Sequence, residues 1–240
     1  MKELNQQIIR FNHDSSFKDE DFYVSKSNKH IVDFLYKWPN WEKNFLNISG
    51  EKNSGKTHLV NIFLKKFKGI KFEAKLFNDQ NLKEIKIYEN IVLENINNEN
   101  LKEVKIHQNI ILENLNSDVD ENLIYTLFNI VDQDNKYLII TSDKNISRIQ
   151  FNLSDLISRS KNFLLQNIEK PDDELIYALL VKNFSDRQIS LEKKLINYII
   201  KRINRSYSKI FEFIYKIDEI SLKKKRAIDL KTIKEVLEKN

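Results

Sequence analysis

The chain has 240 residues, of which 41% are hydrophobic and 31% are charged, so it can bury a core and is not a disordered polymer. It has no cysteine, which excludes disulfide scaffolds, zinc–thiolate sites, iron–sulfur clusters and cysteine nucleophiles. Its four histidines are scattered, which argues against a histidine metal site. The net charge of +5 permits contact with nucleic acid without arguing for it. The apolar runs are too short to span a bilayer and the N-terminus lacks a signal-peptide core, so we expect a cytoplasmic protein with no membrane partner.

Strands and helices are predicted to alternate over the first part of the chain. Apolar runs predict strands over 45–49, 70–74, 90–96, 109–115, 137–140 and 163–165. Helical spacing of apolar residues predicts helices over 59–67 and 120–131. This alternation indicates an α/β fold with a parallel sheet, whose ligands bind at the carboxyl ends of the strands.

After Pro171 the pattern predicts helices alone. Amphipathic segments run over 172–184, 191–203, 206–223 and 229–239. The first of them begins with proline followed by acidic residues, which is a typical helix start. We therefore predict three parts: an N-terminal tail (1–14), an α/β nucleotide-binding core (15–169) and a small all-helical lid (170–240).

Two of the three glycines fall in one motif, Gly50-Glu51-Lys52-Asn53-Ser54-Gly55-Lys56-Thr57, which matches the phosphate-loop pattern G-x-x-x-x-G-K-[ST] in full. Glycine allows positive φ and close approach to an anion, and the backbone N–H groups of such a loop cradle phosphates. The lysine would reach the phosphates and the threonine would hold Mg²⁺. The loop lies between a predicted strand and a predicted helix, as this chemistry requires. The predicted nucleotide-binding residues are Gly50, Asn53, Ser54, Gly55, Lys56, Thr57 and His58.

A phosphate loop usually works with an acidic residue at the end of a neighbouring strand. Two similar segments, 90–96 and 109–115, each carry Glu-Asn near their end, so Glu94 and Glu113 both fit. The second segment leads through one predicted helix to Thr141-Ser142-Asp143, and this spacing favours Glu113 as the catalytic and Mg²⁺-binding acid. Asn114 follows it, and an amide cannot accept a proton from water, so we expect hydrolysis to be weak or dependent on a partner.

Three arginines are candidates for contact with a nucleotide. Arg159 precedes the last predicted strand, where it could reach a nucleotide on a neighbouring subunit, although a surface salt bridge is an equal alternative. Arg202 and Arg205 lie near the end of a lid helix and could approach the nucleotide of their own chain.

Together these residues resemble the DnaA-related AAA+ family, and within it the Hda branch that regulates DnaA, in its alphaproteobacterial form. The resemblance covers nearly the whole chain and is most specific in the GKTHL form of the loop. The matching segments are 21–28, 38–41, 55–59, 120–129, 141–143, 155–159, 180–188 and 205–207. The chain departs from the family at Glu113-Asn114, where Asp-Asp or Asp-Asn is common, and at Ser208, which stands where a sensor II arginine is expected.

The resemblance implies an AAA+ core with a helical lid that binds ADP or ATP with Mg²⁺. It implies a regulator of replication initiation in which Arg159 acts as an arginine finger and promotes hydrolysis of DnaA-bound ATP. The chain ends after the lid segment, without the DNA-binding domain of DnaA, so the initiator role is not expected. The alternatives are a helicase-loader-like ATPase that forms rings, and a tethering adaptor with a structural nucleotide.

The N-terminal tail resembles, in degenerate form, a motif that binds the DNA polymerase III β sliding clamp. Gln6 would hydrogen-bond in the clamp pocket, and Ile9 and Phe11 would fill its apolar part. Through the clamp the chain would reach DNA indirectly, and a homo-oligomer is possible. An incidental apolar patch in a polar tail is the alternative.

Overall fold

The computed structural model describes residues 22–85, 109–224 and 228–238. The predicted clamp-binding residues Gln6, Ile9 and Phe11, the strand predicted over 90–96 and the candidate acid Glu94 lie outside the described residues. Among the described helices, none combines the length and the apolar character needed to cross a membrane.

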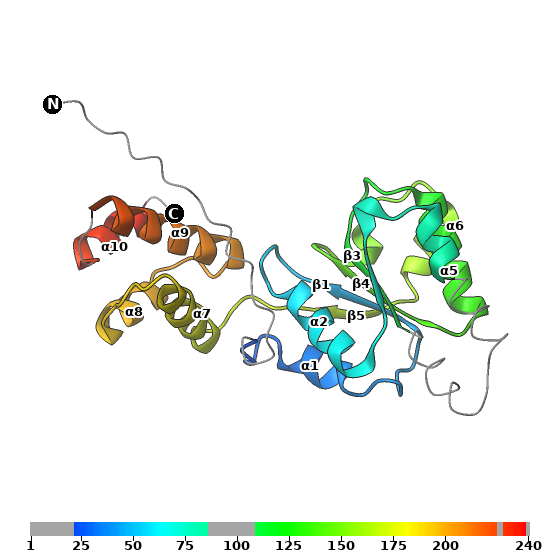
Figure 1. Ribbon diagram of the computed structural model, residues 1–240, viewed down its shortest axis with the longest axis horizontal. Helices are drawn as coiled ribbons and strands as arrows, with labels where there is room; N and C mark the ends of the chain where they lie inside the picture. Colours follow the sequence, from blue (N-terminus) through cyan, green and yellow to red (C-terminus); the bar gives the residue numbers. More distant parts are fainter. Residues whose placement is uncertain (1–21, 86–108, 225–227, 239–240) are drawn as a thin grey trace.

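Within the described ranges, five strands form one sheet, and all are parallel, which confirms the predicted parallel α/β fold (Figure 1). They are β1 (Phe45–Ser49), β2 (Ile70–Glu73), β3 (Asn109–Leu115), β4 (Tyr137–Ser142) and β5 (Leu164–Asn167). Their order across the sheet is β2-β3-β4-β1-β5. The strand before the phosphate loop, β1, therefore lies between β4 and β5, and β3 pairs with β4, as the spacing argument for Glu113 required.

Alternate residues of the strands pack against helices on opposite faces of the sheet. Ile111 and Ile139 share one buried cluster with α1 and α2, whereas Ile110 and Ile140 share another with α5 and α6. The helices of the core are α1 (Lys29–Leu35), α2 (Lys56–Phe67), α5 (Glu121–Gln133) and α6 (Ser154–Ser160). Short 3-10 segments occupy Ala74–Leu76 and Ile146–Arg148, and residues 79–85 are helical.

Helix α5 confirms the predicted start near Asp120, whose carboxylate accepts hydrogen bonds from the backbone of Asn122 and Leu123. Helices α1 and α6 were not predicted. Each has seven residues, which is too few to show a clear period of apolar positions. The apolar anchors of these two short helices are Ile31 and Leu35 in α1 and Leu156 in α6, all fully or almost fully buried.

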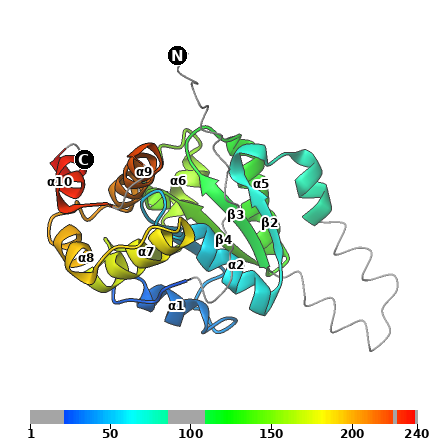
Figure 2. The ribbon, with the colours of Figure 1, turned by 60° about the vertical axis from the view of Figure 1, so that its left-hand side comes forward.

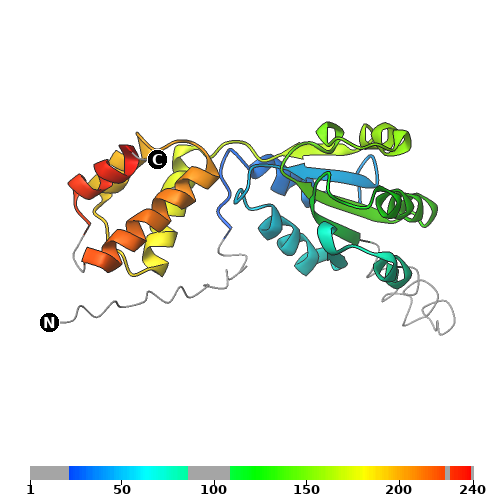
Figure 3. The ribbon, with the colours of Figure 1, turned by 90° about the horizontal axis from the view of Figure 1, so that it is seen from above.

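The described residues after β5 form helices and no strand, as predicted, and these helices make a second lobe beside the sheet domain (Figure 3). They are α7 (Asp173–Asp186), α8 (Lys193–Ile200), α9 (Tyr207–Lys224) and α10 (Leu230–Glu238). They enclose a core of their own, in which Leu180, Phe184, Phe213 and Ile233 are buried. The side chain of Asp172 caps α7 by accepting a hydrogen bond from the backbone N–H of Leu175. The domain limits at 14/15 and 169/170 stay predictions.

Candidate functional site

The phosphate loop joins the carboxyl end of β1 to the start of α2, so strand, loop and helix follow each other as predicted. Gly55 has a φ of 94°, a left-handed conformation that favours glycine, and a Cβ there would lie 3.2 Å from the ring of Phe22. At Gly50 a Cβ would lie 2.8 Å from the Ser54 hydroxyl and 3.0 Å from Ile168. Both glycines are therefore required by the shape of the loop.

Lys56, at the start of α2, brings a positive charge to the inside of the loop. Its side chain is 6% exposed, and Nζ donates to the carbonyl oxygens of Gly50 at 2.6 Å and Glu51 at 3.1 Å. Nζ also forms an ion pair with Asp143 at 2.9 Å, just beyond the end of β4. The ammonium thus lies at the carboxyl ends of β1 and β4, where ligands of a parallel sheet bind.

The remaining predicted loop residues surround this ammonium. Thr57 lies in the first turn of α2, where backbone N–H groups and the helix dipole favour an anion. His58 follows it, and its ring meets the ring of Phe22 edge to face, with centroids 5.1 Å apart. Asn53 has a φ of 68°, and Ser54 is buried, with no hydrogen-bond partner for its hydroxyl in the described part of the chain. The segment 22–28, which is part of the resemblance, thus reaches the loop through Phe22.

The loop also holds the lid, through a residue that the motif leaves unspecified. The carboxylate of Glu51 accepts hydrogen bonds from the Ser206 hydroxyl and from the backbone N–H groups of Tyr207 (3.1 Å) and Ser208 (3.2 Å). These donors form the N-terminus of α9, so Glu51 caps a lid helix from the core. Figure 2 shows the start of α9 beside the loop that follows β1.

The charge of Glu51 is favoured by these contacts. Burial opposes ionisation, but the hydrogen bonds from Ser206, Ser208 and Tyr207 outweigh it and hold the pKa of Glu51 below its usual value. A carboxylate with a lowered pKa stabilises the folded state above its unfolded pKa, and the stabilisation is lost as the pH falls through the folded pKa.

We expect Glu51→Ala to lower the free energy of unfolding at pH 7 by about 1–2 kcal/mol, the typical value of a helix cap. Urea unfolding at several pH values measures this difference. It should shrink as the pH falls below about 4, because Glu51 of the unmodified protein then becomes protonated. The matched control is Glu42→Ala, which removes an exposed carboxylate. A loss that does not depend on pH, or an equal loss at Glu42, would contradict the capping role.

Arg205 and Ser208 flank this contact. The guanidinium of Arg205 pairs with Asp173 at 2.5 Å, half exposed, and the Ser208 hydroxyl donates to the Lys52 carbonyl at 3.3 Å. Ser208 therefore touches the loop, and Arg205 stands one residue before Ser206, which also touches it. The predicted role of Arg205 in nucleotide binding stays a prediction.

Glu113 lies near the end of β3, buried, with its side chain 7% exposed. Its Oε2 is 2.9 Å from Nζ of Lys71 on β2. Asn114 adopts a φ of 59°, and its amide donates to both carboxylate oxygens of Glu73 at 3.1 Å. The residue in the second acid position is therefore an amide turned toward the edge strand β2.

The same geometry tests the predicted Mg²⁺ site. A hydroxyl at Thr57 and a carboxylate at Glu113 are ligand types that Mg²⁺ accepts. The carboxylate, however, already has its charge balanced by the Lys71 ammonium. In the described ranges, no group of three or more Asp, Glu, His or Cys residues is arranged to hold a metal ion. As placed here, the residues do not fit Mg²⁺ without a rearrangement of Lys71.

Arg159 lies near the amino end of β1, whereas the phosphate loop follows its carboxyl end. The arginine lies in the last turn of α6, before β5 begins. A cavity of about 400 Å³ beside it is also lined by Phe45, the first residue of β1, and by Lys43 and Asn44 just before it. Its guanidinium pairs with Asp132 at 3.0 Å and lies 5.3 Å from the centre of the Tyr125 ring. The phosphate loop follows the opposite end of β1, roughly 15 Å along the strand. Arg159 therefore lies near the opposite end of β1 from the loop of its own chain.

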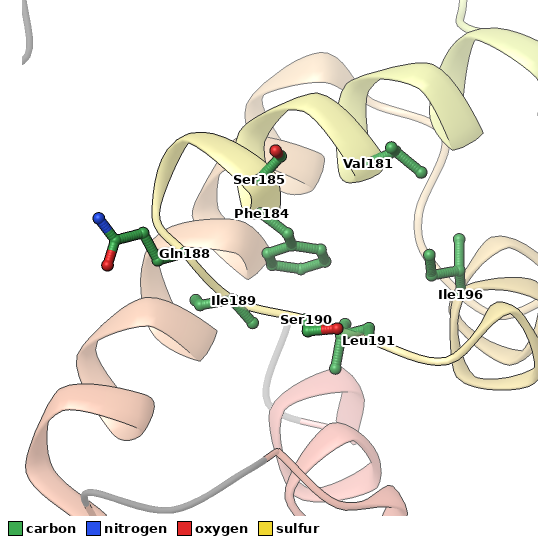
Figure 4. A pocket seen from close by; sticks show the side chains of 8 residues that line it. All are labelled: Val181, Phe184, Ser185, Gln188, Ile189, Ser190, Leu191 and Ile196. Carbon is green, nitrogen blue, oxygen red and sulfur yellow. The ribbon is translucent and has the colours of Figure 1, made fainter.

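A second cavity, of about 360 Å³, lies in the lid between the end of α7 and the start of α8 (Figure 4). Phe184 and Leu191 line it, together with polar but uncharged side chains such as Ser185 and Gln188. Figure 4 shows Gln188 directed away from the cavity. Without a charged group in its lining, this cavity does not suit a phosphate.

Sheet order, phosphate loop and helical lobe together define an AAA+ P-loop core followed by a lid. Residues 172–237, which contain nearly all of the helical lobe, match the family model described as "Hda, lid domain". The match over the lid supports a DnaA-related, Hda-like AAA+ protein, in agreement with the resemblance of the sequence.

The fold is similar to that of solved replication proteins. The chain superposes on domain III of the replication initiation protein DnaA of Thermotoga maritima with a TM-score of 0.66 at 18% identity, covering 94% of this chain and 97% of that one. For AMPPCP-bound DnaA of Aquifex aeolicus the TM-score is 0.57 at 20% identity, over 84% of this chain and 64% of that one. For the RuvB Holliday junction branch migration motor of Thermotoga maritima it is 0.59 at 11% identity, over 90% and 69%. At these identities the likeness shows the fold alone.

One relative in sequence is a protein of Haemophilus influenzae described as uncharacterized. It is 28% identical over 225 residues, which cover 91% of this chain and 92% of the relative. The similarity thus extends over core and lid together.

Proposed function

We propose that this chain is a nucleotide-binding regulator of replication initiation, which promotes hydrolysis of ATP held by the initiator DnaA and so prevents re-initiation. The observation that carries the proposal is the place of Arg159. It is a partly exposed arginine near the amino end of β1, opposite to the end at which its own phosphate loop begins. Such an arginine can act only on a nucleotide bound by another subunit, as an arginine finger does.

The residues around the loop support ADP or ATP as the bound cofactor. The backbone of the loop, Lys56 and the start of α2 offer hydrogen bonds and positive charge to phosphates, and the DnaA structures of the same fold include AMPPCP-bound forms. Mg²⁺, with Thr57 and Glu113 as its ligands, stays a prediction, and Lys71 is its competitor. Because Asn114 stands where a second acid would aid hydrolysis, this chain hydrolyses its own ATP slowly in this proposal. The hydrolysis that it promotes is that of ATP bound to DnaA.

The deciding experiment measures hydrolysis of ATP bound to DnaA, with and without this protein, and with and without DNA-loaded sliding clamp. Stimulation that needs both this protein and the clamp supports the regulator. Rapid ATP turnover by this protein alone, with ring formation, would favour a helicase-loader-like ATPase. Clamp binding without stimulation would favour a tethering adaptor.

The tail makes a separate prediction about the clamp as a partner. Replacing Gln6, Ile9 and Phe11 together by alanine should abolish clamp binding, because the hydrogen-bonding and apolar anchors of the motif are removed. ADP affinity should not change, since these residues precede the described core. Co-elution with the clamp on gel filtration measures the effect. Retention of the triple variant on the clamp would remove the motif assignment.

A further inference from the structure

An ion pair between neighbouring strands joins the acidic residue of β3 to the helix that follows the phosphate loop. Lys71 of β2 lies opposite Ile111 of β3, so its side chain is on the same face of the sheet as that of Glu113, two residues further on. Its Nζ is 2.9 Å from Oε2 of Glu113 and 2.9 Å from Oδ1 of Asn61 on α2. The Lys71 ammonium thus bridges the strand and the helix.

Asn61 fixes where this ammonium lies relative to the loop. It stands four residues after Thr57 on α2, so the two side chains are neighbours on one face of the helix, about 6 Å apart at Cβ. The Lys71 ammonium therefore occupies the space between Glu113 and the helix face that presents Thr57. This is the region where the sequence motif alone places Mg²⁺.

Glu113 depends on this lysine for its charge balance. The carboxylate is buried, and Oε1 has no hydrogen-bond partner within the part of the chain that the structure describes. Taking a carboxylate out of water is costly unless an opposite charge pairs with it, and the Lys71 ammonium supplies that charge. A divalent cation approaching the same carboxylate would meet the repulsion of the ammonium or would have to displace it.

We propose that Lys71 is a built-in cation that competes with Mg²⁺ for Glu113 and thereby makes nucleotide binding by this chain nearly independent of Mg²⁺. The inference rests on the nucleotide site of the proposed function and concerns what sets its metal dependence. The loop, Lys56 and the helix N-terminus then hold the phosphates without a metal bridge to β3. The same pair keeps Glu113 from serving hydrolysis, in line with the amide at Asn114.

Calorimetric titration with ADP, in MgCl₂ and in EDTA, tests the proposal on the whole chain. The unmodified protein should show affinities in the two buffers that agree within about threefold, whereas Lys71→Gln should bind at least about tenfold more tightly with MgCl₂ than with EDTA. Glutamine keeps a hydrogen-bond donor for Glu113 and Asn61 but removes the competing charge. Lys71→Arg keeps the charge and should behave as the unmodified protein does. Lys75→Gln, an exposed lysine four residues along, is the matched control.

Two results would overturn the proposal. One is an ADP affinity of the unmodified protein that already rises more than about tenfold with MgCl₂. This result would contradict the proposal even where the Lys71→Gln variant does not fold. The other is a Lys71→Gln variant with the same Mg²⁺ response as the unmodified protein. Loss of all ADP binding by the unmodified protein would remove the nucleotide site and this inference with it. The titration contains neither DnaA nor clamp, so it can fail while the action on DnaA stands, and the reverse also holds.

Discussion

Arg159→Ala should lose most of the stimulation of DnaA-bound ATP hydrolysis while it keeps ADP binding and clamp binding. An arginine finger stabilises charge on phosphates held by another subunit, and its contribution reaches roughly 10³–10⁵ in rate in phosphoryl-transfer enzymes. Here the guanidinium pairs with a half-exposed carboxylate, Asp132, and lies 5.3 Å from the centre of the Tyr125 ring. Such an exposed pair contributes little to stability, so the variant should fold. Single-turnover hydrolysis of labelled ATP on DnaA measures the loss.

Two further variants give this experiment its contrast. Arg159→Lys should also be a poor stimulator, because an ammonium cannot copy the planar fork of donors that a guanidinium offers to phosphate. Arg148→Ala, which removes an exposed arginine of the 3-10 segment, should stimulate as the unmodified protein does. If Arg159→Ala stimulated DnaA fully, the trans-acting mechanism would fail and the tethering adaptor would become the better description.

Lys56→Ala should weaken the binding of both ADP and ATP at least about tenfold. The substitution removes the positive charge at the carboxyl ends of β1 and β4, which attracts the phosphates. Its ion-pair partner Asp143 is 72% exposed and can be solvated by water, so the fold should survive the change. Isothermal titration calorimetry measures the affinities.

The loop itself provides the control for that experiment. Lys52→Ala removes an exposed lysine of the same loop, three residues before Gly55, and should leave the affinity within about twofold of the unmodified value. Unchanged affinity in Lys56→Ala would instead remove the assignment of a phosphate-binding loop.

The features that could be predicted from sequence are those that local patterns determine. Apolar runs bounded by polar residues predicted the described strands within one or two residues, and the glycine pair predicted the loop between β1 and α2. Helical spacing predicted α5 from Asp120, and proline followed by acidic residues predicted the start of α7. In the structure Asp120 and Asp172 cap these two helices. Helices α1 and α6 were missed because one or two apolar anchors in seven residues define no period.

The contacts that shape the candidate site are of a different kind. Lys71 reaches Glu113 only because β2 pairs with β3, and strand order is a property of the whole sheet. Glu51 accepts its hydrogen bond from Ser206, 155 positions further along the chain, and this contact exists only when the lid packs against the core. No local pattern marks either residue, although an acidic side chain inside a loop that binds anions is a signal that could have drawn attention to Glu51.

The opposite placement of Arg159 and the phosphate loop gives the molecule a direction. A contact that joins two unlike surfaces is head-to-tail, and repeated contacts of this kind build rings or open rows instead of closed pairs. When the surface that carries Arg159 contacts the nucleotide of DnaA, the surface that carries the chain's own phosphate loop faces away from that contact. Under the proposed function, this chain and DnaA would therefore meet head to tail, with a defined polarity.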